Sequence, residues 1–235
     1  MVREQEAVIR EVIERSPFVK SCRLTVPEEI PYTAGQFMCV SYRGEPACRR
    51  YLSFSSSPTE RGYIEFTKRL TGSDFSRFLN SARPGDTVRV RYPYGSFTLR
   101  EDDRKIAFLC GGIGITPVRS MCRYAVDSGQ DRDMVLIYAN RSINEIVFRD
   151  DFESLRQRSR HLRVAHVLCE PAEGFRCSVG FINERVIRDE IPDFAERRFY
   201  ICGPPPMVAA MKDILTNDLK LSDDRVVMEN FSGYG

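Results

Sequence analysis

Hydrophobic and polar positions alternate in short segments over residues 1–101. Alternation with a period of two predicts β-strands with one buried face, and the Pro and Gly residues between the segments predict tight turns. Short strands with little helical periodicity are typical of a small antiparallel barrel or sandwich. One stretch, 73–82, instead places its apolar residues on one helical face, which predicts a short helix against the barrel. The β-rich segments are 7–15, 22–27, 36–43, 51–58, 63–70, 86–93 and 95–99.

From residue 102 onwards the pattern changes to apolar strands that alternate with amphipathic helices. This order of elements predicts a parallel sheet with helices on both faces, as in a Rossmann-like α/β domain. A charged connector at 101–105 separates the two patterns, so we expect one domain over 1–101 and a second over 102–235. The predicted strands are 105–110, 134–139, 162–168, 198–203 and 226–231, and the predicted helices are about 115–127, 147–158, 182–190 and 205–218.

Composition narrows the class of protein without indicating a function. Of the 235 residues 42% are hydrophobic and 29% are charged, which is typical of a globular chain rather than a disordered one. The net charge of +2 does not favour nucleic acid or an anionic membrane as a partner. No apolar run is long enough to span a bilayer and the amino-terminal residues have no apolar signal core, so we expect a cytoplasmic protein.

The eight cysteines are spread along the chain and never form a C-x-x-C spacing. Zinc-ribbon and iron–sulfur ligand patterns are therefore missing, and no metal site is expected. Several of these cysteines fall inside apolar strands, where a free thiol packs as a small core residue. Reduced thiols agree with the expected cytoplasmic location.

Glycine-rich turns follow two of the predicted apolar strands in the second half. The first turn, 111–117 (GGIGITP), lets the backbone approach a pyrophosphate, and the helix that follows presents free N–H groups to it. The second, 202–207 (CGPPPM), also ends a strand, with a proline suited to the first helical turn. Both turns lie at carboxyl strand ends, where ligands of open α/β sheets gather. Taken alone, either one also fits an ordinary tight turn, and Cys202 fits a buried core thiol.

A third predicted strand is followed by the polar residues 140–142 (NRS). At this position they would read the adenosine ribose of a dinucleotide. The alternative is an ordinary capped turn between strand and helix. Arg141 is placed to bind a 2′-phosphate, but the carboxylates of Asp150 and Asp151 would weaken an anion site through repulsion. The segment therefore favours NADH over NADPH.

In the first half, two segments are suited to a flavin nucleotide. The segment RYLSFSSSP combines Arg50, whose guanidinium matches a pyrophosphate, with a run of hydroxyls that begins at Ser53. Further on, Gly72 marks a turn, and Ser73 and Ser76 enter the predicted helix, whose N-terminus is a second place for an anion. The alternative is a surface arginine and a serine-rich strand edge.

Together these segments resemble the ferredoxin–NADP reductase superfamily, in the same order and over nearly the whole chain. RYLS at 50–53 resembles the family's flavin motif R-x-Y-S/T, and 72–76 resembles its diphosphate motif. AGQF at 34–37 and PYGSF at 93–97 resemble two further flavin-domain motifs, and GGIGITP and CGPPPM resemble the nicotinamide-domain signatures. The resemblance implies a six-stranded antiparallel β-barrel that holds FAD, followed by an NAD(P)-binding α/β domain.

By this resemblance the protein is a flavoprotein oxidoreductase. A hydride would pass from NAD(P)H to bound FAD between the domains, and electrons would then pass to a separate acceptor such as a ferredoxin, a haem protein or an oxygenase. The sequence contains no cysteine cluster for a 2Fe–2S centre, which is why the acceptor is expected to be separate. The alternatives are an electron-transfer flavin subunit of a larger complex and a free-flavin reductase. Arg50 and the two expected phosphate sites favour tightly held FAD over the latter.

The resemblance also implies roles for single residues. Arg50 would bind the FAD diphosphate, Ser53 would contact the isoalloxazine ring near N5, and Cys202 would lie against the nicotinamide. Glu229 would help with proton transfer, so Ser53, Cys202 and Glu229 are the expected catalytic residues. The residues expected to contact the two dinucleotides are Arg50, Tyr51, Leu52, Ser53, Thr67, Lys68, Gly72, Ser73, Phe75, Ser76, Gly111, Gly112, Gly114, Thr116, Pro117, Asn140, Arg141, Cys202, Gly203, Pro204, Met207, Phe231 and Tyr234.

The flavin motif and the carboxyl end each leave an alternative open. Leu52 stands where the family usually has a tyrosine. The alternative register, with Arg49 and Tyr51, restores the aromatic residue but places Leu52 at the serine position. At the carboxyl end, Phe231 or Tyr234 would stack on the flavin in the place of the nicotinamide, or would instead belong to the last strand and a frayed terminus.

Overall fold

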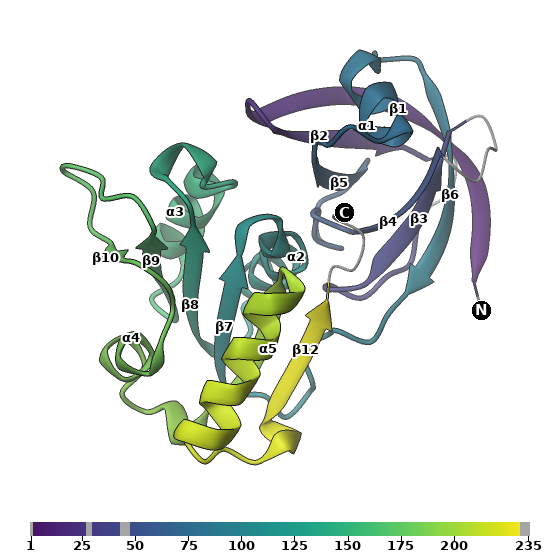
Figure 1. Ribbon diagram of the computed structural model, residues 1–235. Helices are drawn as coiled ribbons and strands as arrows, with labels where there is room; N and C mark the ends of the chain where they lie inside the picture. Colours follow the sequence, from purple (N-terminus) through teal and green to yellow (C-terminus); the bar gives the residue numbers. More distant parts are fainter. Residues whose placement is uncertain (1, 27–29, 43–47, 231–235) are drawn as a thin grey trace.

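The computed structural model describes residues 2–26, 30–42 and 48–230, which form a barrel followed by a parallel α/β sheet (Figure 1). The barrel has six antiparallel strands in the order β4-β3-β6-β1-β2-β5, and a bridge between Phe54 and Phe66 nearly closes it. Alternate side chains point inwards, as Ala7 and Ile9 do on β1, and they form one apolar core. The strands are β1 (Arg3–Ser16), β2 (Val19–Thr25), β3 (Phe37–Ser41), β4 (Arg49–Ser53), β5 (Ile64–Arg69) and β6 (Thr87–Tyr94).

Helix α1 (Asp74–Ser81) packs against the barrel, as the helical pattern predicts. Its apolar face buries Phe75 and Phe78 in the barrel core. The Ser73 hydroxyl caps the helix by accepting a hydrogen bond from the N–H of Ser76, which satisfies one of the donors that a helix N-terminus leaves unpaired. Packing and capping together fix where this N-terminus points.

One predicted strand, 95–99, does not form. Gly95 has a φ of +87°, and the chain leaves the barrel sheet after β6. Phe97 is nevertheless buried, because its ring packs against Tyr200 of the second sheet, with 5.5 Å between the ring centroids. The apolar residues of this segment therefore serve contact between the two halves of the molecule rather than a strand.

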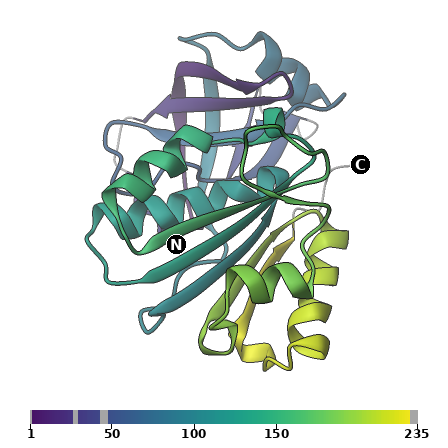
Figure 2. The ribbon, with the colours of Figure 1, turned by 90° about the vertical axis from the view of Figure 1, so that its left-hand side faces the viewer.

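The second half is a six-stranded parallel sheet in the order β10-β9-β8-β7-β11-β12. Helices α2 and α3 cover the face that also packs against the barrel, and α4 and α5 cover the other face (Figures 1 and 2). The elements are β7 (Lys105–Gly111), α2 (Ile115–Asp127), β8 (Asp133–Asn140), α3 (Arg149–Arg158), β9 (Leu162–Leu168), β10 (Ser178–Val179), α4 (Glu184–Glu190), β11 (Arg198–Gly203), α5 (Pro205–Asp213) and β12 (Val226–Asn230), with 3₁₀ turns at Gly112–Gly114, Ile143–Glu145, Phe194–Glu196 and Asp223–Arg225 and a π-helical turn at Ile214–Asp218.

The predicted strands and helices of this half are present, with small differences at their ends. Helix α3 begins at Arg149 rather than at 147, because Phe148 has a left-handed φ of +62°. The two-residue strand β10 was not predicted, since so short a segment carries no periodicity. No helix within 2–26, 30–42 and 48–230 combines the length and apolar character needed to cross a membrane.

Candidate dinucleotide-binding cleft

A cleft of about 1260 Å³ lies where the carboxyl ends of the parallel strands meet the barrel; we call it the interdomain cleft. The strand order reverses between β7 and β11, and the glycine-rich turns after these two strands both border the cleft. Open α/β sheets hold their ligands at such a reversal. The predicted residues that line the cleft are Gly72, Ser73, Gly111, Gly112, Asn140, Arg141, Gly203, Pro204 and Met207.

The first glycine-rich turn packs directly against the strand that carries Cys202. A Cβ atom at Gly114 would lie 2.3 Å from the carbonyl oxygen of Cys202, so this position requires glycine. Gly112 has a φ of +50°, which glycine adopts without strain. The Thr116 hydroxyl donates a hydrogen bond to the carbonyl oxygen of Ile113 over 3.1 Å and holds the first turn of α2 in place. The turn is thus fixed against β11.

Cys202 and Glu229 lie side by side on β11 and β12. Burial, with smaller contributions from Cys110 and Glu229, raises the pKa of the Cys202 thiol well above its ordinary value. Burial also raises the pKa of the Glu229 carboxyl to about 7. Its Oε2 atom has no hydrogen-bond partner among the described residues, and Oε1 lies 3.8 Å from where a Cβ of Gly95 would be. A neutral thiol and a carboxyl that titrates near neutral pH therefore meet at the barrel.

Ser53 ends β4 and is buried, yet its hydroxyl has no hydrogen-bond partner within the described part of the chain. An unpartnered buried hydroxyl costs about 1–3 kcal/mol, so a ligand atom that bonds to it would be stabilising. The neighbouring Leu52 points into the barrel core. Tyr51 is 57% exposed, and its ring meets those of Phe37 and Tyr94 edge-on.

Arg50 and Lys68 bring two positive charges together where the edge strands β4 and β5 approach each other. Burial, and to a smaller extent the charge of Arg50, lowers the pKa of Lys68 to about 8. A phosphate group beside both side chains would relieve this repulsion and accept charge-assisted hydrogen bonds. Two neighbouring cations match the charge of a diphosphate, the group that the sequence pattern predicts here.

Some predicted contacts are buried in packing and do not line the interdomain cleft. Leu52 and Phe75 belong to the barrel core. The Thr67 hydroxyl lies within hydrogen-bond distance of the hydroxyls of Ser21 and Ser55. Pro117 is buried in the first turn of α2. Phe231 and Tyr234 lie outside the described residues.

At the end of β8, Asn140 is buried and its amide makes no hydrogen bond to any described residue. Arg141 forms an ion pair with Glu170 over 3.0 Å. Asp151 lies elsewhere, because it pairs with Arg119 of α2 over 2.5 Å. The carboxylate paired with Arg141 is therefore Glu170, and of the two acids that the sequence pattern suggested, Asp151 is paired elsewhere.

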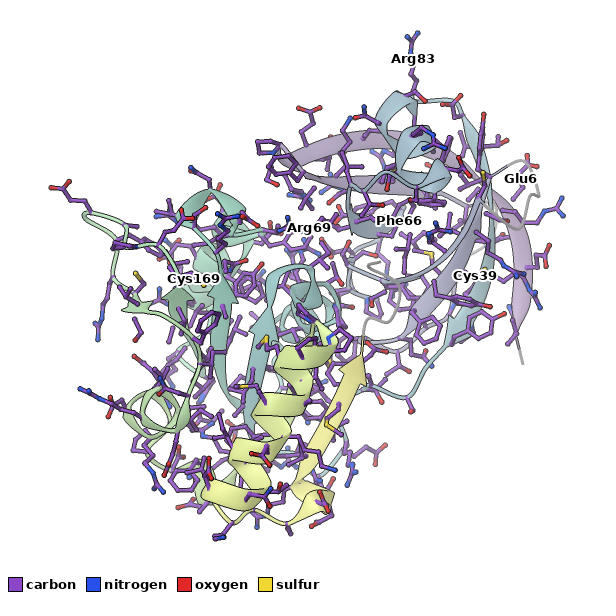
Figure 3. The ribbon with its side chains drawn as sticks, viewed as in Figure 1. Glu6, Cys39, Phe66, Arg69, Arg83 and Cys169 are labelled. Atoms are coloured by element: carbon purple, nitrogen blue, oxygen red, sulfur yellow. The ribbon has the colours of Figure 1, made fainter. Side chains whose placement is uncertain are left out.

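Four further residues of the cleft carried no clear signal in the sequence. Arg69 of β5 forms an ion pair with Glu145, and both line the cleft; Figure 3 shows Arg69 between the barrel and the α/β half. Phe181, which is 77% exposed, and the exposed Cys169 also line it. Arg69 directly follows the predicted contact Lys68 in the sequence. A lone aromatic residue such as Phe181 shows no periodicity that would mark it.

A nearly closed barrel set against the carboxyl end of a doubly wound sheet defines a class of two-domain nucleotide-binding proteins. Residues 6–99 match the oxidoreductase FAD-binding domain family, and residues 108–213 match the oxidoreductase NAD-binding domain family. The chain belongs to the ferredoxin–NADP reductase superfamily of FAD- and NAD-binding oxidoreductases.

Two curated relatives illustrate the range of this family. The chain is 33% identical over 192 residues to the glycine betaine monooxygenase reductase subunit of Pseudomonas aeruginosa, a match that covers 78% of this chain and 52% of that protein. The chain thus spans about half the length of this relative. It is 30% identical over 224 residues to NADH-cytochrome b5 reductase 1 of Emericella nidulans, covering 88% of this chain and 72% of that protein.

Solved structures share the fold over nearly the whole chain. A ferredoxin NADP+ reductase from Neisseria gonorrhoeae with bound FAD and NADP has a TM-score of 0.84 at 23% identity, covering 97% of this chain and 98% of that one. The cytochrome b5 reductase domain of Ulva prolifera nitrate reductase has a TM-score of 0.84 at 20% identity, covering 97% of both chains. The predicted fold and the resemblance to the superfamily are both confirmed.

Proposed function

We propose that this protein is an FAD-containing reductase that oxidises NADH and passes the electrons to a separate acceptor. When bound, FAD accepts a hydride from the nicotinamide and can release electrons one at a time. The relatives support a separate acceptor, since one is the reductase subunit of a monooxygenase and another is a cytochrome b5 reductase. We propose an oxygenase component, a ferredoxin or a haem protein as this acceptor.

The observation that carries the proposal is the pair of unpartnered buried atoms, Ser53 Oγ and Glu229 Oε2, on opposite sides of the domain junction. Phe37 lies between the surroundings of these two atoms in the chain of contacts. It is the register partner of Ser53, and its ring lies 2.7 Å from where a Cβ of Gly95 would be. Glu229 Oε1 lies 3.8 Å from the same position. A flavin ring edge inserted here would offer hydrogen-bond partners to polar groups of both domains.

The proposed roles follow from these positions. Arg50, Lys68 and the N-terminus of α1 hold the FAD diphosphate, and Ser53 orients the isoalloxazine ring. Cys202 provides a neutral, polarisable surface for the nicotinamide, while Glu229 holds a proton near neutral pH. The exposed ring of Phe181 is placed to cover the adenine.

The preference for NADH rests on the carboxylate of Glu170. Its ion pair with Arg141 already satisfies part of the guanidinium that a 2′-phosphate would need. Its negative charge would also repel such a phosphate. The name of the cytochrome b5 reductase relative includes NADH, which supports the same donor.

Two broader expectations also remain proposals. We place the domain boundary between residues 101 and 102, which is supported by family matches that end at residue 99 and begin at residue 108. We propose a cytoplasmic location, which is supported by cysteines that are all free thiols.

Anaerobic stopped-flow reduction of the purified protein tests the function. Flavin absorbance is followed after mixing with NADH or, separately, with NADPH. We expect rapid bleaching by NADH and slower bleaching by NADPH. Faster bleaching by NADPH would keep the reductase but reverse the donor preference. A flavin-containing protein that neither nucleotide reduces would overturn the proposed function.

A further inference from the structure

Helix α2 links the two proposed ring-binding regions by hydrogen bonds across the domain junction. Arg119 Nη1 donates to the carbonyl oxygen of Ser55 over 2.7 Å, and the Ser120 hydroxyl donates to the carbonyl oxygen of Ser56 over 2.6 Å. Ser55 stands two positions after Ser53 on the same chain segment. The flavin-side backbone is thus tied directly to the helix that starts at the glycine-rich turn.

The other end of this link lies at the nicotinamide side. Arg119 follows Thr116 by about one helical turn. Just before the helix, Gly114 packs on the Cys202 carbonyl so closely that no Cβ atom would fit. A shift of Arg119 relative to Ser55 would therefore move the start of α2 relative to the strand of Ser53.

Arg119 is buried at this junction, and each of its N–H donors makes a hydrogen bond. Its side chain is 3% exposed. Both oxygens of Glu60 accept from Nη1 and Nη2 over 2.8 and 3.2 Å, and Asp151 Oδ1 accepts from Nε and Nη2 over 3.0 and 2.5 Å. With the Ser55 carbonyl these bonds occupy the five N–H groups of a guanidinium. The ring of Phe148 lies under it at 5.0 Å.

This arrangement restricts the orientation of the Arg119 guanidinium as well as its distance from the acceptor atoms. A guanidinium is planar and presents its donors in a fixed fork, so acceptors on three sides define its plane. Glu60 and Ser55 belong to the barrel half, and Asp151 belongs to α3. A lysine at this position would keep the charge but would lose the fork and most of the five bonds.

We propose that Arg119 is a positioning residue that sets how the nicotinamide stacks on the flavin. This inference rests on the proposed function. Hydride transfer depends steeply on the distance and angle between the reacting rings, and a misplacement of about 1 Å can slow a reaction about 100-fold. Arg119 acts on the rings only through the backbone of Ser53–Ser55 and the first turn of α2.

The α/β half offers a matched control in Arg197. It is also buried, at 1% exposed, and it pairs with Asp193 and Asp133 and donates to the carbonyl oxygen of Ile106. All of these partners lie in the α/β half. Arg197→Lys therefore disturbs a buried arginine to a similar degree without touching the junction between the halves.

The test compares wild type, Arg119→Lys, Ser120→Ala and Arg197→Lys as purified flavoproteins. Stopped-flow reduction by NADH gives the limiting rate and the half-saturating concentration, and titration with NAD+ gives the flavin difference spectrum without turnover. For Arg119→Lys we expect a limiting rate about 10–100-fold lower and a weaker difference spectrum, with flavin content and half-saturation within about twofold. Ser120→Ala should show a smaller loss in the same direction, and Arg197→Lys none.

The outcomes separate this inference from the proposed function. If NADH reduces the wild type and Arg119→Lys keeps its rate and difference spectrum, Arg119 does not position the rings. If Arg119→Lys fails to fold, Ser120→Ala decides, and a wild-type rate and spectrum there overturn the inference. An equal loss in Arg197→Lys would also overturn it, by showing that any buried arginine has the same effect. A wild type that no nicotinamide reduces would remove the proposed function itself.

Discussion

Cys202 and Glu229 are register partners on β11 and β12, so their side chains leave the parallel sheet on the same face. The carboxyl of Glu229 extends from there towards Gly95 of the barrel half. Burial keeps the thiol protonated and brings the pKa of the carboxyl to about 7. A group that exchanges protons near neutral pH is thus held at the junction where the two dinucleotides are proposed to meet.

Glu229→Gln should alter how stability depends on pH. Burial raises the pKa of Glu229 from 4.5 to about 7, so the folded chain holds this proton more tightly than the unfolded chain. The resulting stabilisation is fully present below about pH 4.5 and is lost as the pH rises through about 7. Across this range we expect the flavin-free wild type to lose about 1–3 kcal/mol more unfolding free energy than Glu229→Gln. Urea unfolding at several pH values measures the difference, and parallel profiles would contradict it.

Cys202→Ala should slow flavin reduction by NADH about tenfold while FAD stays bound, because the nicotinamide would lose a packing surface that orients it. Stopped-flow absorbance measures the rate, and the flavin-to-protein ratio measures retention. Cys122→Ala is the matched control, since Cys122 is equally buried in the same hydrophobic cluster but lies on α2 rather than at the end of β11. An unchanged rate in Cys202→Ala would show that Cys202 serves only in packing.

Arg50→Ala should weaken FAD binding about 10–100-fold, the effect of losing charge-assisted hydrogen bonds worth about 1.5–3 kcal/mol. Dialysis followed by absorbance spectroscopy measures the flavin that remains. Arg49→Ala is the control, because Arg49 is exposed on the adjacent position of β4. Loss of flavin from Arg49→Ala but not from Arg50→Ala would show that the alternative register of the flavin motif is the correct one.

Gly114→Ala should destabilise the fold by about 1–3 kcal/mol, because its new methyl group would overlap the Cys202 backbone and force a shift of α2 or β11. Thermal unfolding should show this as a decrease of about 2–4 °C for each kcal/mol. At Gly72 a Cβ atom would meet nothing within 4 Å, so Gly72→Ala is the control. Equal melting temperatures for the two variants would refute the tight packing at Gly114.

Much of the fold is predictable because each element carries its own periodicity. The alternation on β1 and β6 follows from burying one face, and the apolar runs of β7 and β11 follow from covering a parallel sheet on both faces. The segment 95–99 shows the limit of this reasoning. Phe97 is apolar because it meets Tyr200, a residue far along the chain, and no local pattern separates that contact from a strand.

The candidate site likewise contains residues that a local pattern marks and contacts that no local pattern marks. Glycines at the two turns and the serine cap of α1 are local requirements, so the sequence marks them. The ion pairs of Arg69 with Glu145 and of Arg141 with Glu170 join residues separated by 76 and 29 positions. From the sequence alone, other acidic residues were equally possible partners, as the expectation that placed Asp151 at the ribose end shows.

By itself the sequence determined the two domains, their order, and the family to which the chain belongs. These depend on periodicity and on backbone conformations that few residues tolerate, which are properties of neighbouring positions. The tertiary structure decided which charges pair, which hydroxyl stays unpartnered, and how Arg119 joins the two halves. Such relationships depend on distances between segments remote in the chain, and these distances exist only once both hydrophobic cores have packed.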